Sequence, residues 1–414
     1  MCDTLCGPGP AGGGMVFAKN SDRPVGEVQL AVPFGRRATA GCTLRTQYLS
    51  IGDTGAHAAL LSCPTWLWGA EHGVNEFGVA IGNERVSTVH EAAQARPALI
   101  GMDLVRLGLE RARSAEEGLA ILIDLLTTHG QGGIADAVHD EAYDSSFLIA
   151  DPRAAFVLDT SGTTYAAAPF SHGTAISNRL AVGTGWTVAS PDLDPGDDFD
   201  RFRDRAAPTA SADARLAASR AFLDAQRAVG GGLAPADTAA HLRDHGRGPW
   251  GAPGSDGPAD PPPAGEGPDP ARPSVCMHVP QRSVTAASII AVLPADIDAG
   301  APLRAFVALG SPCVSIYVPA FVRTAAGAPP FVPFELSSEA MWRAADALRQ
   351  RVDADPDAIG PIREVLAPVE AELWGEADDS VEHPDRWPEM GRSWGSRALD
   401  ALLSAAPESP LGHS

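Results

Sequence analysis

The chain has 414 residues, of which 52 are acidic and 31 are basic, so its formal net charge at pH 7 is −21. Apolar residues make up 44% of the sequence, which suffices for a large core and excludes a wholly disordered chain. The acidic balance argues against a nucleic-acid partner and against binding to an anionic membrane, because both need a basic surface.

The first part of the chain alternates between short apolar runs and helical periods. Strands are predicted at residues 15–18, 57–61, 79–82 and 174–177, and a hairpin at 146–150 and 155–159. Helices are predicted over residues 102–112 and from Ser114 to about residue 130, with Ser114 and Glu117 forming a capping box at the start of the second.

The second part begins with predicted helices over residues 211–229 and 237–245, the latter opened by Pro235. Residues 251–272 are rich in Pro, Gly, Ala and Asp, so we predict a flexible loop that cannot bury enough apolar surface to offset its ordering entropy. Strands are then predicted at 284–293, 305–309 and 313–318, and helices from about residue 337 onward. Strands in hairpins with helices in pairs between them favour a layered α+β sandwich over a parallel βαβ series.

No run of the sequence approaches the ~20 apolar residues that a membrane-spanning helix needs, and residues 1–14 do not resemble a signal peptide. The six cysteines contain no CxxC pair and are dispersed, at Cys2, Cys6, Cys42, Cys63, Cys276 and Cys313. We therefore predict a cytoplasmic protein with reduced thiols, and neither a disulfide scaffold nor a metal site.

Cys2 is the most informative candidate for chemistry. The initiator Met is ordinarily removed when a small residue follows it, which would leave a thiol and a free α-amine on one residue. Their ordinary pKa values are ~8.5 and ~8, so the amine can act as the base for its own nucleophile. The alternative is that Cys2 is merely a small residue after the start codon.

The segment from Lys19 to Pro24 places charged and amide groups directly after a predicted strand. Asp22 could accept a hydrogen bond from the terminal ammonium, and Lys19 or Arg23 could lower the pKa of the thiol. Arg23 is also a candidate for binding the substrate. A solvated turn capped by Asp22 would give the same pattern.

Other candidates are single residues. Asn83 and Asn178 each follow or end a predicted strand, where an amide N–H could stabilise an oxyanion, although turn residues look the same. Trp66 and Trp68 could line a substrate pocket, although core packing is the usual role of an aromatic side chain. The run from His139 to Glu141 resembles a metal cluster, but a solvated acidic loop is favoured.

Taken together, these segments resemble the secernin branch of the C69 cysteine peptidases over about residues 1–320. The matching segments are residues 1–4, 16–24, 64–71, 73–84, 101–111, 129–133, 147–152, 274–278 and 312–316. The resemblance implies an N-terminal nucleophile hydrolase, with an αββα sandwich in residues 1–330 and a helical C-terminal extension in residues 331–414.

The resemblance also implies a reaction, hydrolysis of an amide bond, with dipeptides as the substrate class and no cofactor. It implies that Cys2 is the nucleophile, Asp22 the orienting acid and Asn178 the oxyanion or positioning amide, with Asn83 as a further amide. The related choloylglycine-type amidases carry Arg where this chain has Lys19. An amidase acting on a non-peptide amide and a catalytically silent scaffold are the alternatives, and the sequence leaves homo-oligomerisation open.

Overall fold

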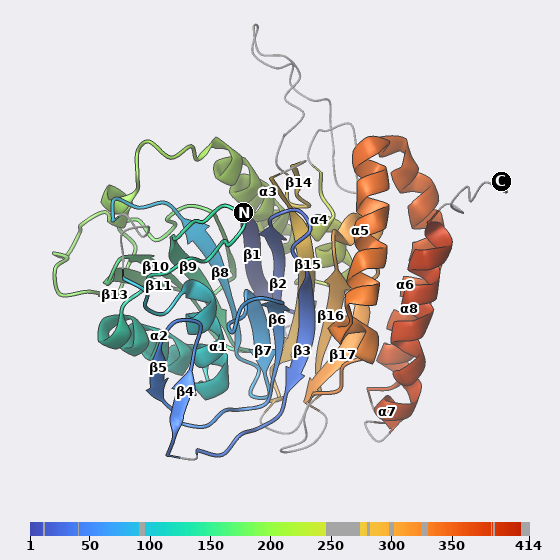
Figure 1. The fold of residues 1–414 in the computed structure, drawn as a ribbon, viewed down its shortest axis with the longest axis horizontal. Coiled ribbons are helices and arrows are strands. Elements are labelled where there is room, and N and C mark those ends of the chain that lie inside the picture. Colours follow the sequence, from blue (N-terminus) through green and yellow to red (C-terminus); the bar gives the residue numbers. More distant parts are fainter. Residues whose placement is uncertain are drawn as a thin grey trace, which may run out of the picture.

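The computed structural model describes residues 1–10, 13–39, 41–90, 96–245, 274–279, 282–297, 302–323, 330–381, 383 and 386–406. Two large antiparallel sheets face each other at the centre, and helices cover their outer faces (Figure 1). The predicted αββα sandwich is therefore confirmed. The loop predicted at residues 251–272 lies outside the described residues.

The first sheet contains the N-terminal strand. Its strands follow the order β12-β1-β2-β15-β16-β17, and β14 pairs with β15. Their bounds are Cys2–Pro8 (β1), Gly14–Arg23 (β2), Thr174–Ser177 (β12), His278–Val279 (β14), Ser283–Pro294 (β15), Leu303–Leu309 (β16) and Val318–Arg323 (β17).

The second sheet has the order β13-β11-β10-β9-β8-β7-β6-β3, and β4 and β5 form a separate small ribbon. The bounds are Gln29–Phe34 (β3), Thr43–Arg45 (β4), Ser50–Gly52 (β5), Ala59–Pro64 (β6), His72–Asn75 (β7), Ala80–Val86 (β8), Asp144–Ala150 (β9), Ala155–Ser161 (β10), Thr164–Phe170 (β11) and Val188–Ala189 (β13). The predicted hairpin corresponds to β9 and β10.

The helices form the outer layers. They are Gly101–Arg111 (α1), Ala115–His129 (α2), Ala210–Val229 (α3), Pro235–Leu242 (α4), Glu339–Ala354 (α5), Ile359–Asp379 (α6), Trp387–Met390 (α7) and Arg392–Ala405 (α8). Helices α1 and α2 pack on the second sheet, and α3 and α4 pack on the first. Among the described residues, no helix combines the length and the apolar character needed to cross a membrane.

Alternating residues of the first sheet face two different cores. On β2, Phe17 points between the sheets while Val16 and Ala18 point towards α3 and α4. On β15, Ile289 and Ile290 divide in the same way. Because side chains alternate along a strand and both faces are covered, these strands are almost continuously apolar.

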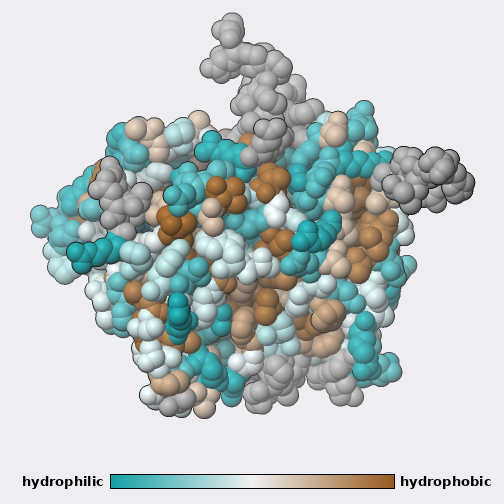
Figure 2. Space-filling view, in the orientation of Figure 1, coloured by the Kyte–Doolittle hydropathy of each residue, from teal (hydrophilic) through white to brown (hydrophobic). Residues whose placement is uncertain are grey.

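The C-terminal helices close one end of the sandwich, on the right in Figure 1. Their apolar residues belong to the same cluster that fills the space between the sheets, and Trp387 stacks on Phe321 of β17 at a centroid distance of 3.8 Å. On the surface seen in Figure 2, hydrophilic side chains predominate along the outline of the molecule and apolar ones are interspersed.

One predicted strand, residues 313–318, is wrong. Pro312 instead opens a 3-10 turn over Pro312–Val314, and β17 begins only at Val318. Proline supplies no N–H to a strand ladder, and its fixed φ suits the first position of a helical turn.

Candidate active site

Three strand ends bring the predicted site residues together. Strand β1 begins at Cys2, and its two antiparallel neighbours, β2 and β12, pair Ser21 with Cys2 and Ser177 with Asp3. Antiparallel pairing places the start of one strand beside the ends of its neighbours. Asp22 and Asn178 follow those paired residues, so they meet Cys2 although they lie 20 and 176 positions away in the sequence.

Cys2 lies in the wall of a pocket of about 660 Å³. Its Sγ accepts a hydrogen bond from the backbone N–H of Asp22 at 3.3 Å, and its own N–H donates to Oδ1 of Asn178 at 2.7 Å. The residue is 5% exposed. Both the sulfur and the nitrogen that would become the α-amine are therefore held by residues that the sequence analysis singled out.

Met1 also lines this pocket. Its amino group donates to the backbone oxygen of Asp22 at 3.2 Å, and its sulfur lies 3.9 Å from Oγ of Ser211 on α3. Burial raises the pKa of the Cys2 thiol to about 12, against the opposing effect of the Lys19 charge. With Met1 attached, the thiol is protonated at neutral pH.

The Asp22 carboxyl group is buried beside Cys2. Its Oδ1 accepts a hydrogen bond from Thr285 of β15 at 2.7 Å, whereas its Oδ2 has no partner among the described residues. Burial raises the pKa of Asp22 to about 6, although the terminal ammonium and Arg215 favour the charged form. An acceptor oxygen without a partner, beside Cys2, is suited to a new cation at that residue.

Asn178 is held between Cys2 and two arginines. Its Oδ1 accepts from Cys2 and from a guanidinium nitrogen of Arg215 at 2.8 Å, and its Nδ2 donates to the backbone oxygen of Arg85 at 3.0 Å. Of the two roles predicted for Asn178, the geometry favours positioning of the Cys2 nitrogen. Its N–H donor is already bound in this state.

Lys19 lies beneath the site rather than in the pocket wall. It is fully buried, donates to the backbone oxygen of Asn83 at 2.8 Å and pairs with Glu84 at 3.2 Å. Burial alone would lower the pKa of Lys19, but its attraction to Cys2, Glu84 and Glu71 outweighs burial and raises it. The positive charge of Lys19 thus lowers the pKa of the Cys2 thiol, as predicted, although burial outweighs it.

Asn83 is not among the described residues that line the pocket. In the side-chain orientation that satisfies both ends of its amide, Nδ2 donates to the backbone oxygen of Glu71 at 2.9 Å. The side chain is 1% exposed. Donation from Asn83 to an oxyanion therefore stays a prediction without a contact that supports it.

Arg23 does line the pocket, but its guanidinium is held on several sides. It donates to Glu27 at 2.6 Å, to Glu71 at 2.8 Å, to Tyr143 at 3.2 Å and to the backbone oxygen of Ala135 at 3.0 Å. The fork of nitrogens that could grip a substrate carboxylate is thus engaged within the protein. This geometry favours a role for Arg23 in building the pocket wall.

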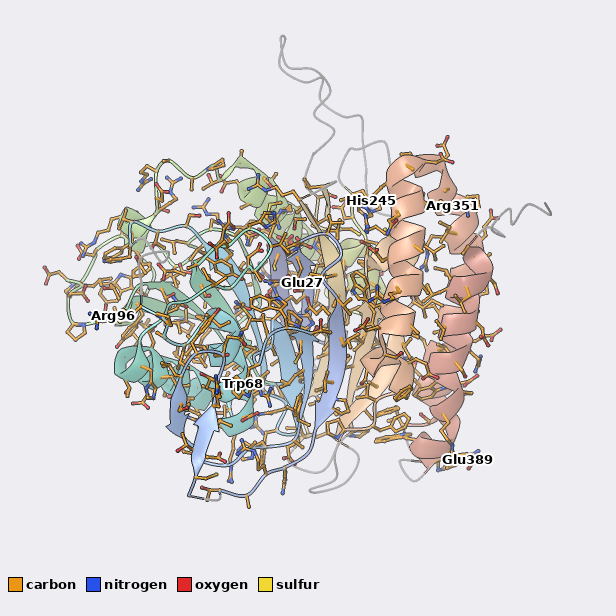
Figure 3. The ribbon with its side chains drawn as sticks, in the orientation of Figure 1. Glu27, Trp68, Arg96, His245, Arg351 and Glu389 are labelled. Atoms are coloured by element: carbon orange, nitrogen blue, oxygen red, sulfur yellow. The ribbon has the colours of Figure 1, made fainter. Side chains whose placement is uncertain are left out.

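Trp66 and Trp68 lie away from the described pocket lining. Trp66 packs on the apolar cluster around Ile100 and Met102, and Trp68 stacks under Arg106 of α1 at 4.2 Å. In Figure 3 the labelled Trp68 lies low in the molecule, near α1. Their surroundings match the core-packing alternative of the sequence analysis.

The mouth of the pocket carries charges of both signs. Arg85 pairs with Glu141 and lies 5.4 Å from the ring of Tyr143, and His139 bonds Asp136 at 2.8 Å. The run from His139 to Glu141 is therefore divided between two pairs rather than gathered around one point. Arg282 lines the pocket, is exposed and forms no ion pair within the described part of the chain.

Sequence reasoning missed Arg215, which lies on the buried side of α3. It donates to the backbone oxygen of Cys2 at 3.0 Å, to Asn178 and to the buried carboxylate of Asp3. A signal for it exists, because Arg215 falls at helical spacing with the buried residues Ala212, Leu216 and Ser219. An arginine on the apolar face of a helix requires a buried partner.

The chain was also compared with known proteins, and no family model matches it. A penicillin V acylase from Agrobacterium tumefaciens has 12% sequence identity and a TM-score of 0.39, over 74% of this chain and 82% of that one. A mutant conjugated bile acid hydrolase from Clostridium perfringens has 11% identity and a TM-score of 0.39, over 74% and 88%. An N-acylethanolamine-hydrolyzing acid amidase orthologue from Caenorhabditis elegans has 12% identity and a TM-score of 0.29, over 43% and 70%.

Proposed function

We propose that this chain is a cysteine-dependent amide hydrolase. Its nucleophile is Sγ of Cys2, its base is the α-amine that Cys2 gains when the Met1–Cys2 bond is cut, and its substrates are dipeptides. The observation that carries the proposal is the placement of both reacting atoms of Cys2. Sγ and N each have a hydrogen-bond partner, Asp22 and Asn178, in the wall of one pocket.

Cleavage of the Met1–Cys2 bond changes the site in two ways. It removes a residue that forms part of the pocket wall, so the thiol gains access to substrate. It also creates an amine at a nitrogen that Asn178 already binds, in the pocket that Asp22, with its unpartnered Oδ2, also lines. When that amine takes the thiol proton, Asp22 stabilises the resulting ammonium, which favours the thiolate.

The reaction then follows acyl-transfer logic. The thiolate forms a bond to the substrate carbonyl carbon, and the ammonium gives its proton to the leaving nitrogen as the C–N bond breaks. Water, deprotonated by the same amine, cleaves the thioester and restores the thiol. The backbone N–H of Asp22, which faces Sγ at 3.3 Å, stabilises the thiolate before attack.

An oxyanion forms at each tetrahedral step, and one donor is expected to lower the barrier by ~2.7–4 kcal/mol. The amide of Asn178 contacts Cys2 through its Oδ1, and its Nδ2 would exchange the backbone oxygen of Arg85 for the substrate oxygen. Asn83 is retained as a second donor only on the sequence resemblance.

The charges of the pocket support a dipeptide as the substrate. A dipeptide is a short zwitterion of ~7 Å when extended. Arg282 lines the pocket without an ion pair within the described part of the chain, and the Arg85–Glu141 pair at the mouth carries one charge of each sign. The resemblance of the sequence to the C69 family points to the same substrate class.

Intact mass and turnover test the proposal together. The purified chain should lack Met1, should hydrolyse members of a dipeptide panel, and should lose turnover in Cys2→Ser while the matched control Cys6→Ser retains it. Cys6 is a suitable control because it is a fully buried cysteine on the same strand as Cys2. A fusion that leaves residues attached before Cys2 should be inactive until they are removed.

Three results would count against parts of this account. Full turnover by a chain whose Met1–Cys2 bond is intact would refute the amine as base. Preference for N-acyl amides over every dipeptide would move the substrate class to the amidase alternative. Absence of turnover, with equal labelling of Cys2 and the other thiols by a cysteine-directed electrophile, would favour the silent scaffold.

A further inference from the structure

A second group of reactive side chains lies outside the pocket. His245, Cys276, His278 and Cys313 are all buried, and one ligand atom from each lies within 4.8 Å of the others. His245 follows α4, Cys276 precedes β14, His278 is the first residue of β14, and Cys313 lies in the turn before β17. In Figure 3 the labelled His245 lies near the upper end of α5.

Two of the distances between these ligand atoms are close to those in a metal tetrahedron. Nε2 of His278 lies 3.2 Å from Sγ of Cys313 and 3.6 Å from Sγ of Cys276. A zinc ion with Zn–N and Zn–S bonds of about 2.0–2.3 Å separates its ligand atoms by about 3.3–3.8 Å. The ring of His245 approaches that of His278 edge-on, at a centroid distance of 5.1 Å.

The outer contact of His278 is the one expected behind a metal ligand. Its Nδ1 lies 2.8 Å from Oδ1 of Asp353 on α5, and Arg349 in turn pairs with Asp353. A carboxylate on one ring nitrogen fixes the tautomer and directs the other nitrogen to the metal. Here Nε2 of His278 faces both sulfurs.

We propose that His245, Cys276, His278 and Cys313 bind one zinc ion in a closed structural site. Two thiolates and two imidazoles that can surround one ion tetrahedrally are a donor set that favours zinc. All four ligands are protein side chains and none lines the pocket, so the ion has no open position for substrate. This inference goes beyond the proposed function and does not depend on it.

The ion would fix the back of the active site. Met277, between two of the ligands, donates its N–H to Oγ1 of Thr285 at 2.9 Å, and Thr285 donates to Asp22 at 2.7 Å. Asn20 on β2 bonds the backbone oxygens of Leu242 and Val275, just beside the ligand-bearing segments. Zinc would thereby hold the carboxyl group of Asp22 in place through one short chain of contacts.

Two other uses of the same residues predict different results. Cys276 and Cys313 could form a disulfide, which would exclude the metal. Cys313, His278 and Asp353 could form a second nucleophilic triad. Both sulfurs are 0% exposed, however, and Cys313 does not lie in the described pocket lining, so a substrate would have no access to it.

Metal content measured by plasma mass spectrometry tests the site directly. The chain purified without chelator should contain one zinc per molecule. Cys276→Ser and Cys313→Ser should lose most of it, while Cys63→Ser, another buried cysteine, should keep it. Asp353→Asn, which weakens the contact behind His278 and also removes the ion pair with Arg349, should weaken zinc binding by ~10–100-fold.

Measurements on the unaltered chain cover the case in which ligand variants fail to fold. Growth in cobalt should give the visible absorption of tetrahedral Co²⁺ with thiolate ligands, and a mercurial thiol reagent should release zinc in proportion to the cysteines modified. A metal-free folded chain would overturn the proposal, as would an intact mass two hydrogens lighter, which marks a disulfide. Cys2→Ser should retain zinc, so a failure of this proposal is separate from a failure of the hydrolase proposal.

Discussion

Replacing Arg215 with methionine removes one half of a buried ion pair at the candidate active site. The Arg215 and Asp3 side chains are only 1% and 2% exposed, and the guanidinium also donates to the backbone of Cys2 and to Asn178. Removing one partner of a buried pair leaves an uncompensated charge, which costs about 3–5 kcal/mol. We expect Arg215→Met to lose that much free energy of unfolding and most of its turnover.

Urea unfolding of three further variants separates the causes. Arg220→Met changes an exposed arginine of the same helix and should stay within about 0.5 kcal/mol of the unaltered chain. The double variant Arg215→Met/Asp3→Asn removes both charges and should recover much of the lost stability. Arg215→Lys keeps a charge but not the fork of donors, so it should fold better than Arg215→Met yet turn over poorly.

The pH dependence gives a further check. Burial raises the pKa of Asp3 and Arg215 opposes that effect, so loss of Arg215 should raise it further. A carboxyl group with a raised pKa binds more protons when folded, and stability then falls as pH rises above its unfolded pKa. The penalty of Arg215→Met should therefore be largest near pH 8 and shrink towards pH 4. A penalty below 1 kcal/mol, or one that does not change with pH, would refute this reasoning.

Two further predictions concern buried carboxyl groups. Asp22→Asn keeps the shape and the Thr285 contact but removes the partner of the Cys2 ammonium, so turnover should fall ~10²-fold or more without loss of stability; an active Asp22→Asn enzyme would contradict the orienting role. Burial raises the pKa of Asp103 at the start of α1 to about 7, so the fold loses stability as the pH rises from the ordinary aspartate pKa of ~3.9 to about 7, and no more above it. Asp103→Asn should gain up to about 4 kcal/mol at pH 8 and nothing near pH 4, and an equal effect at both values in urea unfolding would show that ionisation is not the cause.

Local sequence features predicted most of the elements because they depend on neighbours along the chain. Ser114 caps α2 by accepting the N–H of Glu117, Pro235 opens α4, and the turn after residue 150 closes the hairpin of β9 and β10. Cys2, Asp22 and Asn178 were also identifiable, since each belongs to a short segment at a strand end.

Long-range pairing decided the rest. Antiparallel register brings Cys2, Asp22 and Asn178 together where strands β1, β2 and β12 begin or end. Helix α3 then brings Arg215 over them from a separate part of the chain. Local patterns also suggested site roles for Asn83, which follows a predicted strand, and for Trp66 and Trp68 as aromatic residues. None of the three lies in the described pocket lining.

The cluster of His245, Cys276, His278 and Cys313 shows the limit most clearly. These residues have no metal-binding spacing in the sequence, and only the packing of α4, β14 and the turn before β17 brings their ligand atoms within 4.8 Å. The sequence by itself predicted most of the strands and helices and singled out Cys2 as a candidate nucleophile, because those signals are local. Which side chains share a pocket or a metal-sized space depends on contacts between distant segments, and only the tertiary structure decided that.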